Sequence, residues 1–247
     1  MKLTILGTGS PLPVPGRVQT GCLLEKDNRL LLVDCGSGVY DQLQKLRVDW
    51  KRLDTFLLTH HHLDHLSDLL TIVTARFLLG YPKATVYGPS GTKALIEGLL
   101  DLFPYVRNFA DVQAHDLQVH ETVTIAGFRI TSMAMRHFNV TTLSYKFDDM
   151  LVICGDSDPL PELKGFAQGC KLLIHECSYT DKQAGNGHAH PTGLGEVLAG
   201  AKLDELWLTH FYPEASQPQQ EGAIIEAVRR HFKGRVKLAQ DMMEIQL

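Results

Sequence analysis

The chain has 247 residues, of which 44% are hydrophobic and 21% are charged, and its formal net charge is −4 at pH 7. These values are typical of a soluble globular protein, and the negative charge argues against a dedicated nucleic-acid-binding protein. No apolar run approaches the roughly 20 residues of a membrane-spanning helix, and the N-terminus lacks a signal-peptide pattern. We therefore expect one domain over residues 1–247, without a membrane partner.

The cysteines indicate a reducing compartment. Their number is odd, none has a neighbour at Cys-x-x-Cys spacing, and most lie inside apolar runs: Cys22, Cys35, Cys154, Cys170 and Cys177. Cysteines of this kind are usually reduced core residues. We therefore expect a cytoplasmic protein.

The N-terminal third begins with strands. Residues 3–6 form an apolar run that ends in a glycine-containing turn and a proline-rich loop. Residues 21–25 and 29–34 flank Lys26-Asp27-Asn28, which predicts a hairpin. The glycines of Asp34-Cys-Gly-Ser-Gly then lead into a predicted helix over 39–46.

A cluster of metal-binding residue types follows the next predicted strand. The apolar run 56–58 ends in a segment rich in histidine and aspartate: His60, His61, His62, Asp64 and His65. His60 and His62 are two residues apart, so at a strand end they point to the same side and can hold one ion. Asp64 and His65 lie just past the bend and can reach a second ion. Imidazoles together with a carboxylate favour a hydrolytic metal site.

The rest of the chain alternates between strands and helices. We predict helices over 66–79, 91–102, 159–168, 192–201 and 219–231, and strands over 85–87, 141–147, 151–154, 171–175, 205–209, 236–239 and 243–246. Residues 112–136 alternate in polarity between turn signals, which predicts antiparallel strands. This pattern suits two packed sheets with helices outside, although a three-layer α/β fold would fit the pattern equally well.

Three further candidate ligands each follow an apolar run. His137 follows residues 130–136, Asp156 follows 151–155, and His210 follows 206–209. Strand ends gather at one edge of a sheet, so these side chains can converge with the histidine cluster although they are far apart in sequence.

These motifs resemble the metallo-β-lactamase superfamily, and within it ribonuclease Z and its small phosphodiesterase relatives. The segments that carry the resemblance are His60-x-His-x-Asp-His, Leu6-Gly-Thr-Gly-Ser, Asp34-Cys-Gly-Ser-Gly, Gly155-Asp-Ser, His175-Glu-Cys-Ser, His190-Pro-Thr and Thr209-His-Phe. Together they cover nearly the whole chain. The resemblance implies a four-layer αββα sandwich.

The resemblance also implies a dinuclear metal site. Its ligands would be His60, His62 and His137 for one ion and Asp64, His65 and His210 for the other, with Asp156 bridging both. Two such ions generate a hydroxide nucleophile and clamp a phosphoryl group. We expect zinc, with manganese or iron as alternatives.

The resemblance also implies that further residues act in catalysis. The resemblance places a leaving-group acid or charge-stabilising histidine at His190, with His188, two residues earlier, as the competitor. Glu176 would orient His190 through a carboxylate–imidazole bond. Asp64 would also orient the nucleophile or accept its proton, and His61 would point away from its neighbours.

One departure from ribonuclease Z concerns the substrate. That family carries a protruding arm that grips tRNA, often between the third histidine and the bridging aspartate, whereas His137 and Asp156 are only 19 residues apart here. We therefore expect a phosphodiesterase of small nucleotide-like substrates rather than an enzyme of RNA. The alternatives are a tRNA 3′ endonuclease without an arm, a lactone or ester hydrolase, and a metal-bound ligand sensor without turnover. The resemblance also implies a homodimer.

Overall fold

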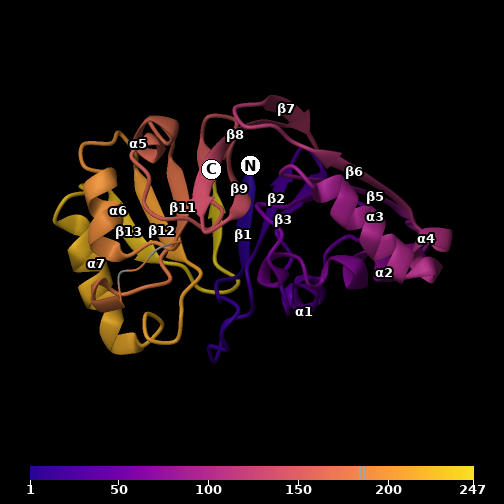
Figure 1. The fold of residues 1–247 in the computed structure, drawn as a ribbon, viewed down its shortest axis with the longest axis horizontal. Coiled ribbons are helices and arrows are strands. Elements are labelled where there is room, and N and C mark those ends of the chain that lie inside the picture. Colours follow the sequence, from indigo (N-terminus) through magenta and orange to yellow (C-terminus); the bar gives the residue numbers. More distant parts are fainter. Residues whose placement is uncertain (184, 186) are drawn as a thin grey trace.

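Two mixed β-sheets lie face to face in the computed structural model, which describes residues 1–183, 185 and 187–247. Each sheet has seven strands. Helices α1 to α4 lie beside one sheet and α5 to α7 beside the other (Figure 1). The four-layer αββα sandwich expected from the sequence is therefore confirmed.

The first sheet has the strand order β14-β1-β2-β3-β4-β5-β6. Its strands are β1 (Lys2–Gly7), β2 (Gly21–Lys26), β3 (Arg29–Val33), β4 (Thr55–Leu57), β5 (Lys83–Gly88), β6 (Asp111–Asp116) and β14 (Glu244–Gln246). The helices outside it are α1 (Val39–Lys45), α2 (Leu69–Leu78), α3 (Thr92–Leu102) and α4 (Pro104–Phe109). A 3-10 turn over Leu63–His65 precedes α2.

The second sheet has the strand order β13-β12-β11-β10-β9-β8-β7. Its strands are β7 (Thr122–Ile125), β8 (Phe128–His137), β9 (Val140–Phe147), β10 (Leu151–Ile153), β11 (Leu172–Glu176), β12 (Glu205–Thr209) and β13 (Arg235–Leu238). The helices outside it are α5 (Glu162–Phe166), α6 (Pro191–Val197) and α7 (Glu221–Arg229), with 3-10 turns over Asp181–Gln183 and Pro218–Gln220.

Apolar side chains fill the space between the sheets and the space beneath each helical layer. Phe128, Phe147 and Trp207 belong to the cluster between the sheets, and separate clusters lie under α1 to α4 and under α5 to α7. Strands that are covered on both faces need apolar residues on both, which explains continuous runs such as those of β3 and β12. No helix in the described part of the chain has the length and apolar character that a membrane crossing requires.

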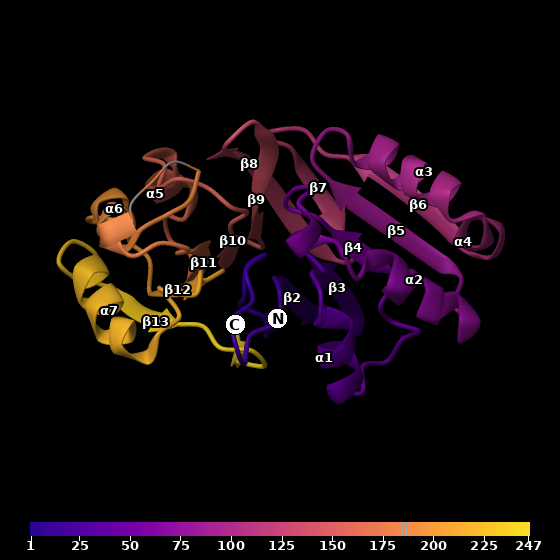
Figure 2. The same cartoon turned by 60° about the horizontal axis from the view of Figure 1, so that its bottom comes forward.

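The two chain ends meet in the middle of the molecule. The Met1 amino group donates a hydrogen bond to the Leu247 carbonyl oxygen over 2.9 Å. Both views show the termini side by side (Figures 1 and 2). Strand β14 therefore completes the edge of the first sheet by pairing antiparallel with β1.

Several local predictions were wrong; for example, α5 begins at Glu162 rather than residue 159, and α6 ends at Val197 rather than residue 201. Strand β6 pairs in parallel with β5 rather than antiparallel with β7, because α3 and α4 carry the chain back across the sheet before β6 begins. Helix α2 begins at Leu69 rather than residue 66, because the 3-10 turn over Leu63–His65 occupies the segment before it.

Hydrogen bonds join the two sheets just before the histidine cluster. The Tyr145 hydroxyl of β9 donates to the Leu58 carbonyl over 2.8 Å, and the Leu143 amide donates to the Thr59 carbonyl over 2.9 Å. Gly155 lies in the same place, where a Cβ would be 2.8 Å from the Leu143 oxygen and 2.9 Å from the Thr59 Cβ. The end of β4 is thus fixed against β9, and only glycine fits between them.

The buried Tyr145 hydroxyl provides a stability test. Tyr145→Phe should lower the free energy of unfolding by about 1–2 kcal/mol, because the Leu58 carbonyl loses a buried donor. Tyr81→Phe, at a partly exposed tyrosine, serves as the control and should have little effect. Thermal melting of both variants checks this. Equal melting temperatures would contradict a structural role for the bond.

Candidate metal centre

The polar cluster lies where strands of both sheets end. His60 and His62 follow β4, and Asp64 and His65 lie in the 3-10 turn behind them. From the second sheet, His137 ends β8, Asp156 follows β10 and His210 follows β12. Strands β10, β11 and β12 run parallel, so their carboxyl ends reach the same edge. The structure therefore brings all the predicted ligand positions to one place.

The first group of donors consists of three histidines. One nitrogen from each of His60, His62 and His137 lies within 4.8 Å of the others. His137 Nε2 is 3.1 Å from His62 Nδ1. Two of these residues are buried and His62 is half-buried, so the group is largely shielded from solvent.

The second group adds two carboxylates, and all its members are buried: Asp64, His65, Asp156 and His210. His210 Nε2 is 3.0 Å from Asp64 Oδ2 and 3.3 Å from His65 Nε2. Asp156 lies between the two groups, because its Oδ2 is 3.2 Å from His210 Nε2 and 3.9 Å from both His60 Nε2 and His137 Nε2. One carboxylate can therefore reach both groups.

The donor set fits divalent metal ions. His60 Nε2 is buried and has no hydrogen-bond partner among the described residues, a costly arrangement unless a ligand satisfies it. Burial lowers the pKa of His60 well below its ordinary value, so its imidazole is neutral and can donate a lone pair. Although burial opposes ionisation, His210 and His65 hold the pKa of Asp156 well below its usual range.

Further side chains fix the orientation of the imidazoles. Asp34 Oδ2 accepts a hydrogen bond from His65 Nδ1 over 2.8 Å, and its two oxygens also accept from the Thr59 amide and hydroxyl. Ser178 Oγ is 2.9 Å from His210 Nδ1, and the Gly187 carbonyl is 2.6 Å from His137 Nδ1. Each of these contacts leaves Nε2 free to face the cluster.

Asp34 was not predicted to act at the site. It directly follows β3 with φ at 57°, a left-handed backbone conformation that is uncommon for residues other than glycine. His210 shares this conformation at 58°. Two signals were present in the sequence: Asp34 ends an apolar run, as the predicted ligands do, and it opens the Asp34-Cys-Gly-Ser-Gly segment that carries part of the family resemblance.

The expectation that Glu176 contacts His190 is wrong. Glu176 Oε1 is 2.8 Å from His188 Nδ1 instead. His188 is buried, its Nδ1 is 4.0 Å from Asp156 Oδ2, and its ring stacks 5.5 Å from that of His210. Although burial opposes protonation, the hydrogen bond and charge of Glu176 raise the pKa of His188. The structure therefore places His188, not His190, beside the donor groups.

His190 lies at the start of α6. Its Nδ1 is 3.0 Å from Asp181 Oδ1 and 3.4 Å from the Gly193 amide nitrogen, and His190 is the N-cap residue of α6. It therefore caps the helix. His61 points away from the cluster as predicted, with its Nε2 2.7 Å from Thr92 Oγ1.

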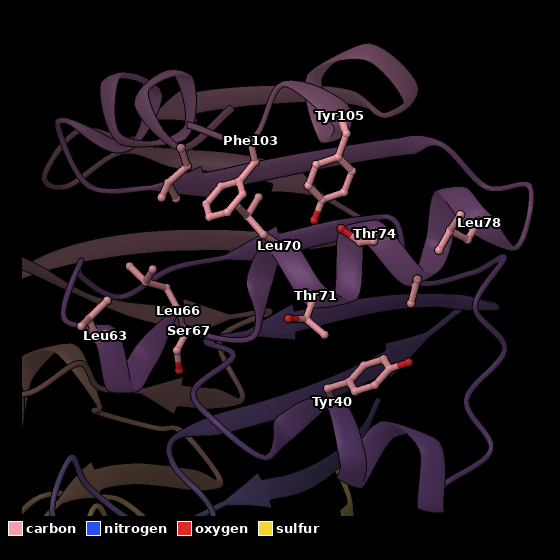
Figure 3. Close-up of a pocket in the computed structure, with 12 residues that line it drawn as sticks. Tyr40, Leu63, Leu66, Ser67, Leu70, Thr71, Thr74, Leu78, Phe103 and Tyr105 are labelled. Atoms are coloured by element: carbon pink, nitrogen blue, oxygen red, sulfur yellow. The ribbon is translucent and has the colours of Figure 1, made fainter. Parts of the chain in front are cut away.

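An apolar groove of about 600 Å³ runs along α2 and starts beside the cluster of histidine and aspartate side chains. Figure 3 shows Tyr40 on one side of α2 and Phe103 and Tyr105 on the other. Leu63, which lies between His62 and Asp64 in the chain, is 75% exposed at one end, and Leu78 is 74% exposed at the other. None of the predicted ligands is among the described residues that line this groove.

An αββα sandwich with a histidine- and aspartate-rich centre at the sheet edge defines a metal-dependent hydrolase of the metallo-β-lactamase superfamily, close to ribonuclease Z. A family model described as "Anti-Pycsar protein Apyc1" matches residues 1–233. The chain belongs to this family.

Individual proteins agree with this placement. Ribonuclease Z of Mycobacterium avium (strain 104) is 28% identical, and the match covers 100% of this chain and 98% of that protein. The metallo-β-lactamase fold protein YhfI from Bacillus subtilis superposes with a TM-score of 0.83 at 25% identity, over 99% of this chain and 98% of YhfI. The short form of human tRNase Z has the same fold, with a TM-score of 0.76 at 22% identity over 100% and 99% of the two chains.

The position of Asp34 behind His65 leads to a test of metal affinity. Asp34→Ala should weaken metal binding about 10–100-fold, because His65 loses the carboxylate that holds its Nε2 toward the cluster. Competition with a chromogenic chelator measures this directly. Asp68→Ala, at an acid whose carboxylate accepts a hydrogen bond from the Tyr40 amide in α1, is the control. Unchanged affinity in the Asp34 variant would contradict the orienting role.

Proposed function

We propose that this metal-dependent hydrolase is a phosphodiesterase that acts on a small nucleotide-like phosphodiester. The observation that carries the proposal is the buried Glu176–His188 pair beside the seven converging donors. The alkoxide that leaves a phosphodiester needs a proton, whereas a ligand sensor without turnover has no need of a leaving-group acid.

Two ions would be held by residues of both sheets. His60, His62 and His137 would bind one ion and Asp64, His65 and His210 the other, with Asp156 shared. When bound, such a pair lowers the pKa of water and neutralises charge on the phosphoryl oxygens. Zinc is the proposed metal because histidine dominates the donor set, with manganese and iron as the alternatives.

The remaining catalytic roles would belong to side chains around the ions. His188 donates a proton to the leaving oxygen, and Glu176 holds the His188 ring through Nδ1 and favours its protonated form. Asp64 orients the attacking water or accepts its proton. Tyr212, whose hydroxyl is 3.2 Å from His188 Nε2, contacts the other side of the same ring.

Short connections around the site favour a small substrate. Two residues, 138 and 139, join β8 to β9, and three residues, 148 to 150, join β9 to β10. No segment between His137 and Asp156 is long enough to form an arm that grips a folded RNA, and the net charge of −4 adds no attraction to one.

A tRNA 3′ endonuclease is the second candidate. The observation in its favour is that the curated relatives are named ribonuclease Z and match along the full chain. A lactone or ester hydrolase and a ligand sensor without turnover are the remaining alternatives. Precursor tRNA, a lactone and a thioester therefore belong in the same substrate panel. Cleavage of precursor tRNA at substoichiometric enzyme would favour the nuclease.

The leaving-group acid provides the sharpest test. His188→Ala should reduce kcat/KM about 10²–10⁴-fold for a dinucleoside monophosphate, whose alkoxide needs a proton to leave. The loss should be much smaller for bis(p-nitrophenyl) phosphate, because p-nitrophenolate leaves without one. The matched control is His190→Ala, which should change neither rate more than a few-fold. Metal content should be the same in all three proteins.

Two results would count against this assignment. Equal losses on both substrates in His188→Ala would indicate that His188 maintains the site rather than donating a proton. Absence of turnover across the whole panel by the metal-loaded protein would favour the sensor instead.

We also propose a homodimer in which a second copy covers the groove along α2. The resemblance to ribonuclease Z suggests the dimer, and the exposed Leu63 and Leu78 side chains support this surface as the contact. Leu78→Glu should convert the dimer to the 27.5 kDa monomer in sedimentation experiments. Val119→Glu, an exposed residue outside the groove, should leave it dimeric. A monomeric wild-type protein would contradict the proposal.

We propose the cytoplasm as the site of action. All five cysteines are buried and unpaired, which suits a reducing compartment.

A further inference from the structure

The turn that follows His137 contains an unusual residue. Strands β8 and β9 pair up to His137 and Val140, so Phe138 and Asn139 are the two central residues of the turn. Phe138 has φ at 46°, whereas Asn139 is not among the described residues with positive φ. A positive φ at the first central position is typical of a type II′ turn, where glycine is preferred. A bulky aromatic residue there is conformationally costly.

The Phe138 ring gains little burial in return. It is 58% exposed, so filling the apolar core does not explain it. An exposed aromatic side chain in a strained turn suggests a role in binding rather than in stability.

The ring stands at the mouth of the metal centre. Its centroid is 4.8 Å from the ring of His137, a predicted ligand, and 5.8 Å from the ring of His188. The backbone of Gly187 supports one edge, because a Cβ at Gly187 would lie only 2.6 Å from the Phe138 Cε1 and Cζ atoms. The ring is therefore held in place on one side and open to solvent on the other.

We propose that Phe138 is a specificity-determining residue whose exposed ring stacks on the aromatic base of the substrate. The proposal rests on the phosphodiesterase function proposed above, since a phosphate held at the donor groups would place an attached nucleoside within reach of the rim. Every nucleobase has a π-face, so an aromatic platform selects substrates with a base over aliphatic phosphodiesters.

Binding of two matched product-like probes separates stacking from other roles. Adenosine 5′-monophosphate carries a base, and ribose 5-phosphate is the same phosphate and sugar without it. In the metal-loaded protein, calorimetry should show about tenfold weaker binding of adenosine 5′-monophosphate after Phe138→Ala, because one base–aromatic stack is lost. The Kd of ribose 5-phosphate should change less than twofold.

Three further variants complete the test. Phe138→Trp should retain tight binding of adenosine 5′-monophosphate, whereas Phe138→Gly, which suits the turn, should lose it without a lower melting temperature or metal content. Phe109→Ala removes an aromatic ring on α4 that is 67% exposed, compared with 58% for Phe138, and should change neither Kd. Equal weakening of both probes in Phe138→Ala would overturn the proposal, because it would show that the ring only positions His137. No change for either probe would overturn it as well.

The binding measurement does not require catalysis, so the two proposals can fail separately. If the wild-type protein hydrolyses no phosphodiester but still binds adenosine 5′-monophosphate through Phe138, the proposed function fails and the stacking role stands. If phosphodiesters are hydrolysed and binding does not depend on Phe138, only the stacking role fails.

Discussion

The contact between the two sheets at the end of β4 is the constraint on which the site depends. Hydrogen bonds from Tyr145 and Leu143 to the carbonyls of Leu58 and Thr59 fix the chain just before His60. The histidine cluster comes from the first sheet, whereas Asp156 and His210 come from the second. A small slip of one sheet over the other would separate donor atoms that now lie within 4.8 Å of one another. The apolar core between the sheets therefore supports the chemistry as well as the fold.

Backbone strain near the donors also follows from the need to hold side chains from both sheets close together. Asp34 and His210 both adopt positive φ values at strand ends, which turn their side chains back toward the cluster. Such conformations cost free energy and persist only where surrounding contacts hold them. For Asp34 these contacts are three hydrogen bonds to Thr59 and His65. The network thus links strand β3 to the histidine motif before any ligand binds.

Most of the fold could be predicted from the sequence because apolar runs mark the buried strands. Strand β12 was predicted residue for residue, since a short apolar run is bounded by acidic residues and His210. The partner of a strand is not encoded in its own periodicity, which is why β6 was assigned to an antiparallel pairing. The convergence of the candidate ligands was also predictable from strand ends. The choice between His188 and His190 was not, because it depends on which imidazole reaches Glu176 in the folded loop.

The division of the donors between two sheets has a consequence for biosynthesis. The His60 motif is translated early, but His210 follows only after most of the second sheet has been made. A truncated or nascent chain that ends before strand β12 lacks His210 and therefore cannot assemble the full donor set. The complete donor set thus forms only late in synthesis, after both sheets have been made.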